Sequence, residues 1–566
     1  LKAAIEKVVT IKPVKKRNNV KKSNSKGAIL KEIEKETANL DHWQRQAAIE
    51  TPDGPQRVRG LAGSGKTVVL AWKAAYLHAQ YPEWNIAITF YTRSLYQQFK
   101  DLIRRFTFAQ SKDEPNWEKL QVIHAWGNRN QAGLYSKIAN SIDYPVRDWN
   151  YAKTKYGYNQ AFEGICNELI TIVQNRKISP LYDTILIDEA QDLPISFFKI
   201  ILPFLTQEQR VVWVYDELQN LTTDYSVPPP EVLFGQDEFG ESKVKLANTE
   251  GEARQDIILP ICYRNTPWAL TAAHALGFGI YKQEGLVQLF DDDSLWEDIG
   301  YKLTQGTFEP KTKVSLKRKE NSYPEFFDRL FSSDESISCN YFENFNQEID
   351  WIVTQILKNL QEDELEYDDI LIILPDVITA KDKANQIISV LRGCSIQAHL
   401  VGVSSSVDEM FKPDSIAISH IYRAKGNEAP MVYILNAGYC ANGLELRKLR
   451  NGLFTAITRS RGWVNICGSG EGMKKIKAEF DELKKHKFSL NFTLPDPDAR
   501  QKLRTINRDR TAAEKAKYNR SIKGTEELFE SINKGEIDIN SLPPKLIEQM
   551  KKIIGEKMLD TSPTKK

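Results

Sequence analysis

The sequence predicts an α/β protein with two parallel-sheet domains and a helical C-terminal extension. Short runs rich in Val and Ile alternate with longer amphipathic stretches, a pattern typical of parallel strands covered by helices on both faces. This alternation occurs twice along the 566 residues, a length that suits about two to four domains. Hydrophobic residues make up 41% of the chain, enough for cores of that size.

The elements follow in chain order. Residues 1–27 are polar and basic, and we expect a flexible arm there. The first domain is expected over 28–258, with strands at 85–90, 120–126, 184–190 and 210–216. The second domain is expected over 259–474, with strands at 368–376, 414–422, 430–437 and 463–468. Residues 475–566 are charged and predicted to be mainly helical.

Basic residues gather at both ends of the chain. The first 26 residues hold nine Lys or Arg against one acid, and Arg500–Lys523 holds nine against two, although the net charge is only +2. Two interpretations stay open: solvated tails, or a sequence-independent attraction for nucleic-acid phosphates.

Several classes of protein are disfavoured. No apolar run reaches the ~18–20 residues of a membrane span, and no secretory signal with a cleavage site is visible, so we expect a cytoplasmic location. The six cysteines form no CxxC pair, which argues against a zinc or iron–sulfur site and against a disulfide scaffold. The chain begins at Leu1 rather than Met, which leaves an upstream segment open.

A glycine-rich stretch, "GLAGSGKT" (60–67), fits the phosphate-loop pattern GxxxxGK[ST]. Glycines let backbone N–H groups turn toward phosphate oxygens, and a following helix directs its positive end at them. The pattern predicts an ATP site whose loop residues are Gly60, Ala62, Gly63, Ser64, Gly65, Lys66 and Thr67. Lys66 supplies positive charge, and the Thr67 hydroxyl suits Mg²⁺.

An apolar run ending in two acids, "TILIDEAQD" (184–192), supplies the partner that such a site needs. Asp188 is expected in the Mg²⁺ shell. Glu189 is expected to orient and deprotonate the attacking water.

Further short motifs occur in a fixed order. They are "LDHWQRQAAI" (40–49), "ITFYTRSL" (88–95), "VIHAWG" (122–127), "VYDELQNL" (214–221), "CYRN" (262–265), "ISHIYRAKGNEAPMVYIL" (418–435) and "FTAITRSRGW" (454–463). Together with the phosphate loop and DEAQD, they make the chain resemble superfamily 1 helicases of the UvrD/Rep type over roughly residues 40–470. The resemblance implies two RecA-like domains with ATP in the cleft between them and movement on DNA, 3′ to 5′.

The resemblance also implies individual roles at the nucleotide. The implied contacts are Gln44 with adenine, Gln219 and Arg264 with the γ-phosphate, Tyr263 stacked on the base, Glu428 on the ribose with Gly426 allowing close approach, and Arg459 as the arginine finger. A cation at the developing charge is commonly worth roughly 10³–10⁵ in rate.

The same motifs carry candidates for binding a single strand, which is held by aromatic stacking and a basic groove. These candidates are Phe90, Thr92, Arg93, His124, Trp126, His420 and Tyr422. A core role for Phe90 or Trp126, and a satisfied buried role for His124, remain alternatives.

The chain departs from the family pattern in two ways. Tyr215 replaces the glycine of the third motif, so its base-stacking residue is uncertain. The stretch before the AKG motif leaves no room for the large inserted subdomain, and the first-domain insertion is reduced. Efficient duplex unwinding is therefore an open question.

The leading hypothesis is an ATP-dependent, DNA-stimulated translocase or helicase, with repair or defence as a role known only by family association. One alternative is an RNA-directed helicase of the same superfamily. Another is an ATP switch that controls a nuclease or other protein partner.

Overall fold

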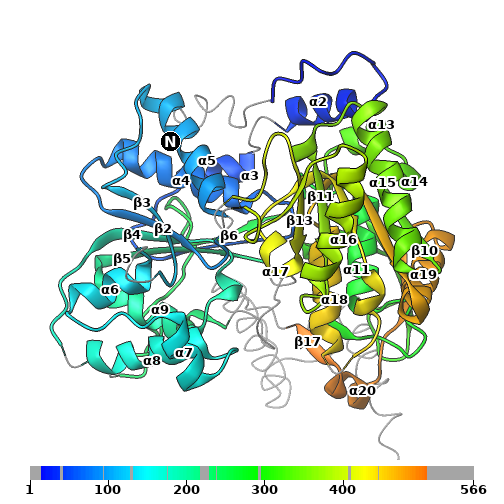
Figure 1. Cartoon of the computed structure of the whole chain (residues 1–566). Coiled ribbons are helices and arrows are strands. Elements are labelled where there is room, and N and C mark those ends of the chain that lie inside the picture. The colour runs from blue at the N-terminus through cyan, green and yellow to red at the C-terminus, as the bar shows by residue number, and fades with distance from the viewer. Residues whose placement is uncertain are drawn as a thin grey trace, which may run out of the picture. The chain divides into compact units, whose positions relative to one another are not determined.

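The first sheet of the computed structural model has six parallel strands in the order β3-β2-β4-β5-β1-β6 (Figure 1). The strands are β1 (Gln56–Gly60), β2 (Ile86–Phe90), β3 (Leu120–His124), β4 (Tyr182–Ile187), β5 (Leu205–Tyr215) and β6 (Asp256–Leu259). All four runs predicted for this domain form strands. The structure describes residues 15–37, 42–93, 95–127, 132–174, 176–216, 228–237, 239–290, 295–405, 409–443 and 445–506.

Alternating side chains give this sheet two apolar faces. Ile86 and Ile88 point to one face and pack with α3 (His42–Ile49), α4 (Lys66–Gln80) and α5 (Leu95–Ser111). Ala87 and Ile185 point to the other, which is covered by α6 (Leu134–Ser141), α7 (Trp149–Tyr156), α8 (Ala161–Val173) and α9 (Ile195–Ile201). Figure 1 shows the first group above the sheet and the second group below it.

The second sheet is also six-stranded and parallel, in the order β10-β15-β14-β11-β13-β12. Its strands are β10 (Ile337–Phe342), β11 (Ile370–Leu374), β12 (Ala398–Leu400), β13 (Ile416–His420), β14 (Ala429–Ile434) and β15 (Ser460–Ser469). The four runs predicted for this domain are β11, β13, β14 and β15. The predicted fold class of two parallel-sheet α/β domains is therefore confirmed.

Two helical layers cover the second sheet. One consists of α11 (Pro267–Phe278), α18 (Leu446–Ile457) and α19 (Gly470–Lys485). The other consists of α2 (Lys26–Glu36), α15 (Phe345–Gln361) and α16 (Ala380–Gly393). Shorter helices connect these elements: α10 (Pro230–Leu233), α12 (Leu295–Asp298), α13 (Phe326–Leu330), α14 (Ser333–Ser336) and α17 (Ile421–Ala424). No helix within the described ranges has the length and apolarity to cross a membrane.

The position of α2 differs from the expected domain division. It precedes the first sheet in sequence, yet Leu30 and Ile33 belong to the core of the second sheet, and α2 contacts α13 (Figure 1). Residues 15–27, expected within a flexible arm, also contact this domain, and the Gly27 amide donates to the Asp363 carbonyl at 2.8 Å. The docking depends on partners more than 300 positions away in sequence, which a local pattern does not encode.

The region predicted as a helical extension is mixed where the structure describes it. The end of α19 is followed by β16 (Leu490–Thr493), α20 (Pro497–Lys502) and β17 (Arg504–Ile506). β16 joins β8 (Tyr301–Gln305) and β9 (Lys313–Arg318) in an antiparallel sheet, and β17 pairs with β7 (Gln288–Phe290). Residues 507–566, which include most of the second basic stretch, lie outside the described residues.

Both insertions are small. The first domain carries α6, α7 and α8 between β3 and β4, and residues 401–415 connect β12 directly to β13. The carboxyl ends of β1 and β4 meet at one edge of the first sheet, which is where open parallel sheets bind ligands.

Candidate nucleotide site

The phosphate loop connects the end of β1 to the start of α4. Gly63 and Gly65 have φ values of +78° and +84°, a left-handed conformation that glycine adopts without strain. A Cβ atom on Gly65 would lie 2.4 Å from Nε2 of Gln44, and one on Gly63 would lie 2.7 Å from Cβ of Arg264. Only glycine fits either position. The loop therefore brings backbone amides to the N-terminus of α4, the arrangement that binds phosphate groups.

Two polar side chains follow the loop. Nζ of Lys66 donates to the carbonyl oxygens of Gly60 and Leu61, both at 2.8 Å, and lies 3.6 Å from Oδ2 of Asp216. The hydroxyl of Thr67 donates to Oδ2 of Asp188 at 2.8 Å. The loop and the acid at the end of β4 therefore meet directly.

Asp188 is fully buried directly after β4. Burial, together with the neighbouring Glu189 charge, raises the pKa of Asp188 to about 7. The amide of Glu189 donates to Oδ1 of Asp188 at 3.0 Å, which fixes the carboxyl group. A carboxylate beside a hydroxyl is an oxygen donor set of the kind that Mg²⁺ prefers, so these residues fit the metal that the sequence implies.

Glu189 has a φ of +50°, which is unusual for a residue with a side chain. Its carboxylate accepts a 2.5 Å hydrogen bond from Gln191 and lies 3.9 Å from Nζ of Lys425. Burial alone would raise the pKa of Glu189, but the positive charges of Lys425, Lys66 and Arg459 hold it below its ordinary value. Lys425 also pairs with Asp192 at 2.6 Å, and all three charges are buried. An ionised carboxylate of this kind is suited to accept a proton.

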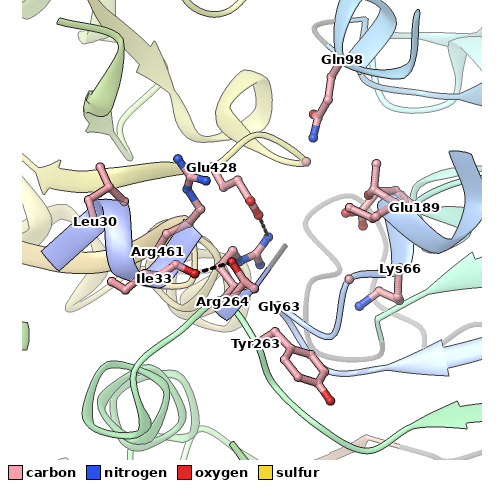
Figure 2. A pocket seen from close by; sticks show the side chains of 15 residues that line it. Leu30, Ile33, Gly63, Lys66, Gln98, Glu189, Tyr263, Arg264, Glu428 and Arg461 are labelled. Atoms are coloured by element: carbon pink, nitrogen blue, oxygen red, sulfur yellow. Dashed lines mark hydrogen bonds and ion pairs between the residues drawn. The ribbon is translucent and has the colours of Figure 1, made fainter. Parts of the chain in front are cut away.

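The second domain supplies the opposite side of the pocket (Figure 2). The Tyr263 amide donates to the Gly63 carbonyl at 2.9 Å, and Nη1 of Arg264 donates to Oε2 of Glu428 at 2.9 Å. Gly426 also lines the pocket, with a φ of +83°. A Cβ there would lie 2.7 Å from the Leu95 side chain, so the close approach at Gly426 is made by α5.

Two predicted nucleotide contacts do not line the pocket, and a third is not described. Gln44 donates to the Ser64 carbonyl at 2.8 Å and does not line the pocket. Arg459 is buried beside it, where Nε donates to the Thr455 carbonyl at 3.1 Å. Burial and the neighbouring Arg264 charge lower the pKa of Arg459 to about 9. Gln219 lies outside the described residues.

The sequence analysis missed six pocket residues: Leu30, Ile33, Thr37, Val68, Gln98 and Arg461. Buried Oε1 of Gln98, Nε of Arg461 and Nε of Arg264 have no hydrogen-bond partner among the described residues. Buried polar atoms are nearly always paired, so these three atoms indicate a polar ligand. Arg461 stands two positions after Arg459 in the same motif, "ITRSRG" (457–462), and a second arginine so close to the first was a usable signal.

Two nucleic-acid candidates are core residues. Phe90 is fully buried and stacks on Phe99 with ring centroids 5.3 Å apart. Trp126 is also buried, stacks on Phe162 at 5.0 Å, and donates its indole N–H to the Arg147 carbonyl. Their burial contradicts the predicted stacking role, because neither ring presents a free face to a base.

The other five candidates differ in exposure. Nε2 of His124 lies 2.5 Å from the Tyr91 carbonyl oxygen, so this ring is satisfied internally. Burial and the neighbouring Arg423 charge lower the pKa of His420 to about 4, so it is neutral at pH 7. Tyr422, on α17, is 43% exposed. The remaining two, Thr92 and Arg93, are partly exposed beyond β2.

Two exposed aromatics on the reduced insertion were also missed. Trp149 and Tyr158 are 39% and 71% exposed, and their rings meet edge to face at 5.2 Å. They bound the stretch "WNYAKTKYGY" (149–158), in which two lysines stand between two pairs of aromatic residues. Such interleaving is typical of surfaces that stack single-stranded bases.

One comparison with known proteins bears on the predicted resemblance. Residues 415–467 match the family model of the UvrD-like helicase C-terminal domain, which confirms the predicted resemblance to UvrD/Rep-type helicases. No curated protein matches the chain. Among solved structures, the C-terminal domain of a possible DNA helicase from Lactobacillus plantarum WCFS1 is 19% identical; the match covers 25% of this chain and 79% of that one, with a TM-score of 0.19.

Proposed function

We propose that this chain, which carries a UvrD-like helicase segment in its second domain, hydrolyses ATP to move along single-stranded DNA. The observation that carries the proposal is the pocket of Figure 2. Its phosphate loop and Glu189 come from the domain of the first sheet, and Tyr263, Arg264 and Glu428 come from the second domain. A ligand in this pocket contacts both domains.

The residues divide the chemistry among them. The loop amides and Lys66 would hold the phosphates, and Thr67 with Asp188 would hold Mg²⁺, which supplies positive charge to the phosphate oxygens when bound. Glu189, kept ionised by neighbouring cations, orients and deprotonates the attacking water. Arg264 and Arg459 place positive charge where negative charge develops. The resemblance also implies that Gln219 senses the γ-phosphate and that Gln44 reads adenine, for which Gln44 would have to exchange its bond to the Ser64 carbonyl for one to the base.

Coupling between hydrolysis and movement is supported by contacts that cross the pocket. Lys425, in the AKG motif after β13, pairs with Asp192 and approaches Glu189, both of which follow β4. A change in the charge or position of Glu189 would therefore alter the ion pairs of Lys425, which precedes β14. Movement from 3′ to 5′, and a role in repair or defence, follow only from the family resemblance.

The strand-binding surface that we propose consists of Tyr422, Trp149 and Tyr158. Tyr422 lies on α17 of the second domain, and Trp149 and Tyr158 lie on the insertion of the first. Each of the two domains thus presents exposed aromatic rings. Base stacking on such rings is worth about 1–3 kcal/mol per base.

Steady-state ATP hydrolysis tests the proposal, measured alone and with single-stranded DNA, single-stranded RNA or duplex DNA. We expect strong stimulation by single-stranded DNA, with Glu189→Gln as a blank that binds ATP without hydrolysing it and Lys66→Ala inactive. Equal stimulation by RNA would favour the RNA-directed alternative. Hydrolysis indifferent to every nucleic acid would favour a switch that controls a nuclease or other partner. Normal hydrolysis by Glu189→Gln would refute the catalytic assignment.

A further inference from the structure

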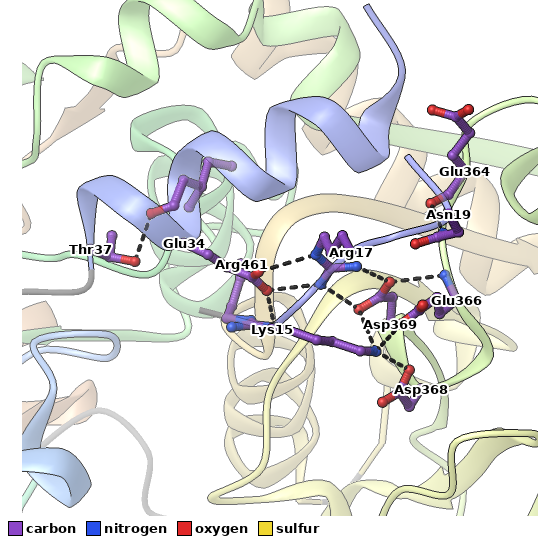
Figure 3. A network of polar contacts seen from close by, with 11 residues as sticks. Lys15, Arg17, Asn19, Glu34, Thr37, Glu364, Glu366, Asp368, Asp369 and Arg461 are labelled. Carbon is purple, nitrogen blue, oxygen red and sulfur yellow. Dashed lines mark hydrogen bonds and ion pairs between the residues drawn. The ribbon is translucent and has the colours of Figure 1, made fainter. Parts of the chain in front are cut away.

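The N-terminal segment, residues 15–37, is anchored on the second domain by a buried ion-pair cluster (Figure 3). The Arg17 side chain is 0% exposed and binds two carboxylates, with Nη2 2.8 Å from Oε1 of Glu34 and Nη1 2.7 Å from Oδ2 of Asp369. Lys15 adds a 2.6 Å pair with Asp368. Because a guanidinium forks between two carboxylates in a fixed geometry, the cluster sets the position of α2.

Backbone contacts add to this anchor. The amides of Lys21 and Lys22 and the hydroxyl of Ser25 all donate to the carboxylate of Glu364. A Cβ on Gly27 would lie 2.6 Å from the Glu364 carbonyl oxygen, so α2 begins in direct contact with this loop. Three cations of the basic stretch, Lys15, Arg17 and Lys26, are thus paired with carboxylates of the second domain.

One face of the anchored helix borders the nucleotide pocket. Leu30, Ile33 and Thr37 follow a three- and four-residue spacing and line it. Figure 2 shows Leu30 and Ile33 on the opposite side of the pocket from Lys66 and Glu189. Charged phosphates are costly to bury against apolar side chains, whereas a purine base gains from that contact.

Arg461 connects this wall to the anchor. It lines the pocket from β15, and its guanidinium lies 3.8 Å from Oε1 of Glu34, the carboxylate that Arg17 also binds. Its Nε is buried and has no hydrogen-bond partner in the part of the chain that the structure describes. A planar guanidinium whose Nε–H makes no hydrogen bond within the described residues can stack on an aromatic base or donate a hydrogen bond to it.

We propose that α2 and Arg461 form the base-facing wall of the ATP pocket, so that the N-terminal segment sets the affinity for the purine. This inference rests on the proposed function of the pocket. It makes residues before the first sheet part of the binding site, although they are carried by the second domain.

The test compares two ligands that share the phosphate end and differ in the base. Calorimetric titration measures the affinities for a non-hydrolysable ATP analogue and for tripolyphosphate, both with Mg²⁺. We expect Ile33→Ala to weaken the analogue about tenfold, as for the loss of one or two methylene contacts, and to leave tripolyphosphate unchanged. Arg461→Gln should act in the same direction without disturbing the core.

Ile29→Ala is the matched control, because Ile29 lies on the same helix and packs on the same core but does not line the pocket. It should leave the ratio of the two affinities unchanged. An unchanged ratio in both Ile33→Ala and Arg461→Gln, or an equal loss for both ligands, would overturn the inference. A wild-type chain that binds neither ligand would instead overturn the proposed function, and this inference with it.

Discussion

Replacing Arg17 by Met should release α2 from the second domain while leaving the two sheets folded. The guanidinium makes four hydrogen bonds with Glu34 and Asp369, and its removal leaves two carboxylates in a buried site. Breaking a buried ion pair by removing one partner costs about 3–5 kcal/mol. At the lower limit, local opening of the helix becomes about a hundred times more frequent.

Hydrogen exchange followed by mass spectrometry measures this opening directly. We expect peptides from α2 to exchange about a hundred times faster in Arg17→Met, with the strands of the first sheet unchanged. Lys15→Met is the control, because Lys15 is 35% exposed and such pairs contribute about 1 kcal/mol or less. Equal protection of α2 in wild type and Arg17→Met would refute the idea that this cluster holds the helix.

Three further predictions concern pH, turnover and strand binding. Burial alone would raise the pKa of Asp369, but Arg17 holds this pKa below its ordinary value. Docking of α2 should therefore persist above about pH 4 and be lost as the pH falls through the lowered pKa. Pulse-labelling of the α2 amides with deuterium at pH 5 and pH 3 measures this loss. Lys425→Met should slow ATP turnover at least about tenfold with ATP affinity nearly unchanged, because Glu189 would no longer be held where it can accept the proton of the attacking water. Single-turnover rates equal to wild type would show that Lys425 does not position Glu189. Tyr158→Ala and Tyr422→Ala should each weaken binding of labelled oligothymidine about 5- to 100-fold by fluorescence anisotropy, and unchanged affinity in both would argue against the proposed surface.

The fold was predictable where strands are buried on both faces. Runs such as Ile370–Leu374 are apolar throughout, as parallel strands covered by helices require. The strand at Ile337–Phe342 was missed because only two of its six residues are fully buried, so it carries a weaker apolar signal at the edge of its sheet. The pairing of β16 with β9 joins segments far apart in the chain, which no local pattern shows.

The candidate site likewise contains residues that local motifs predict and residues that only long-range contacts bring together. The phosphate loop, Asp188 and Glu189 lie within short motifs, and the structure brings them together as their spacing indicates. The wall formed by α2 depends on Arg17 meeting Asp369, 352 positions away, so the sequence analysis did not include it. The presence of an aromatic residue in a motif also does not show whether its ring is buried or exposed. The ring of Phe90 is enclosed by the core, although the motif order placed it among the strand contacts.

The anchored N-terminal segment also limits how far the two domains can separate. α2 packs on the second domain and α3 packs on the first sheet, and residues 37–42 are the covalent link between these two helices. A link of that length spans about 18 Å at most when fully extended. A second link runs from β6 to α11, so two covalent tethers cross between the domains. While α2 stays docked, the length of the shorter link therefore sets an upper limit on any separation of the two sheets at the pocket of Figure 2.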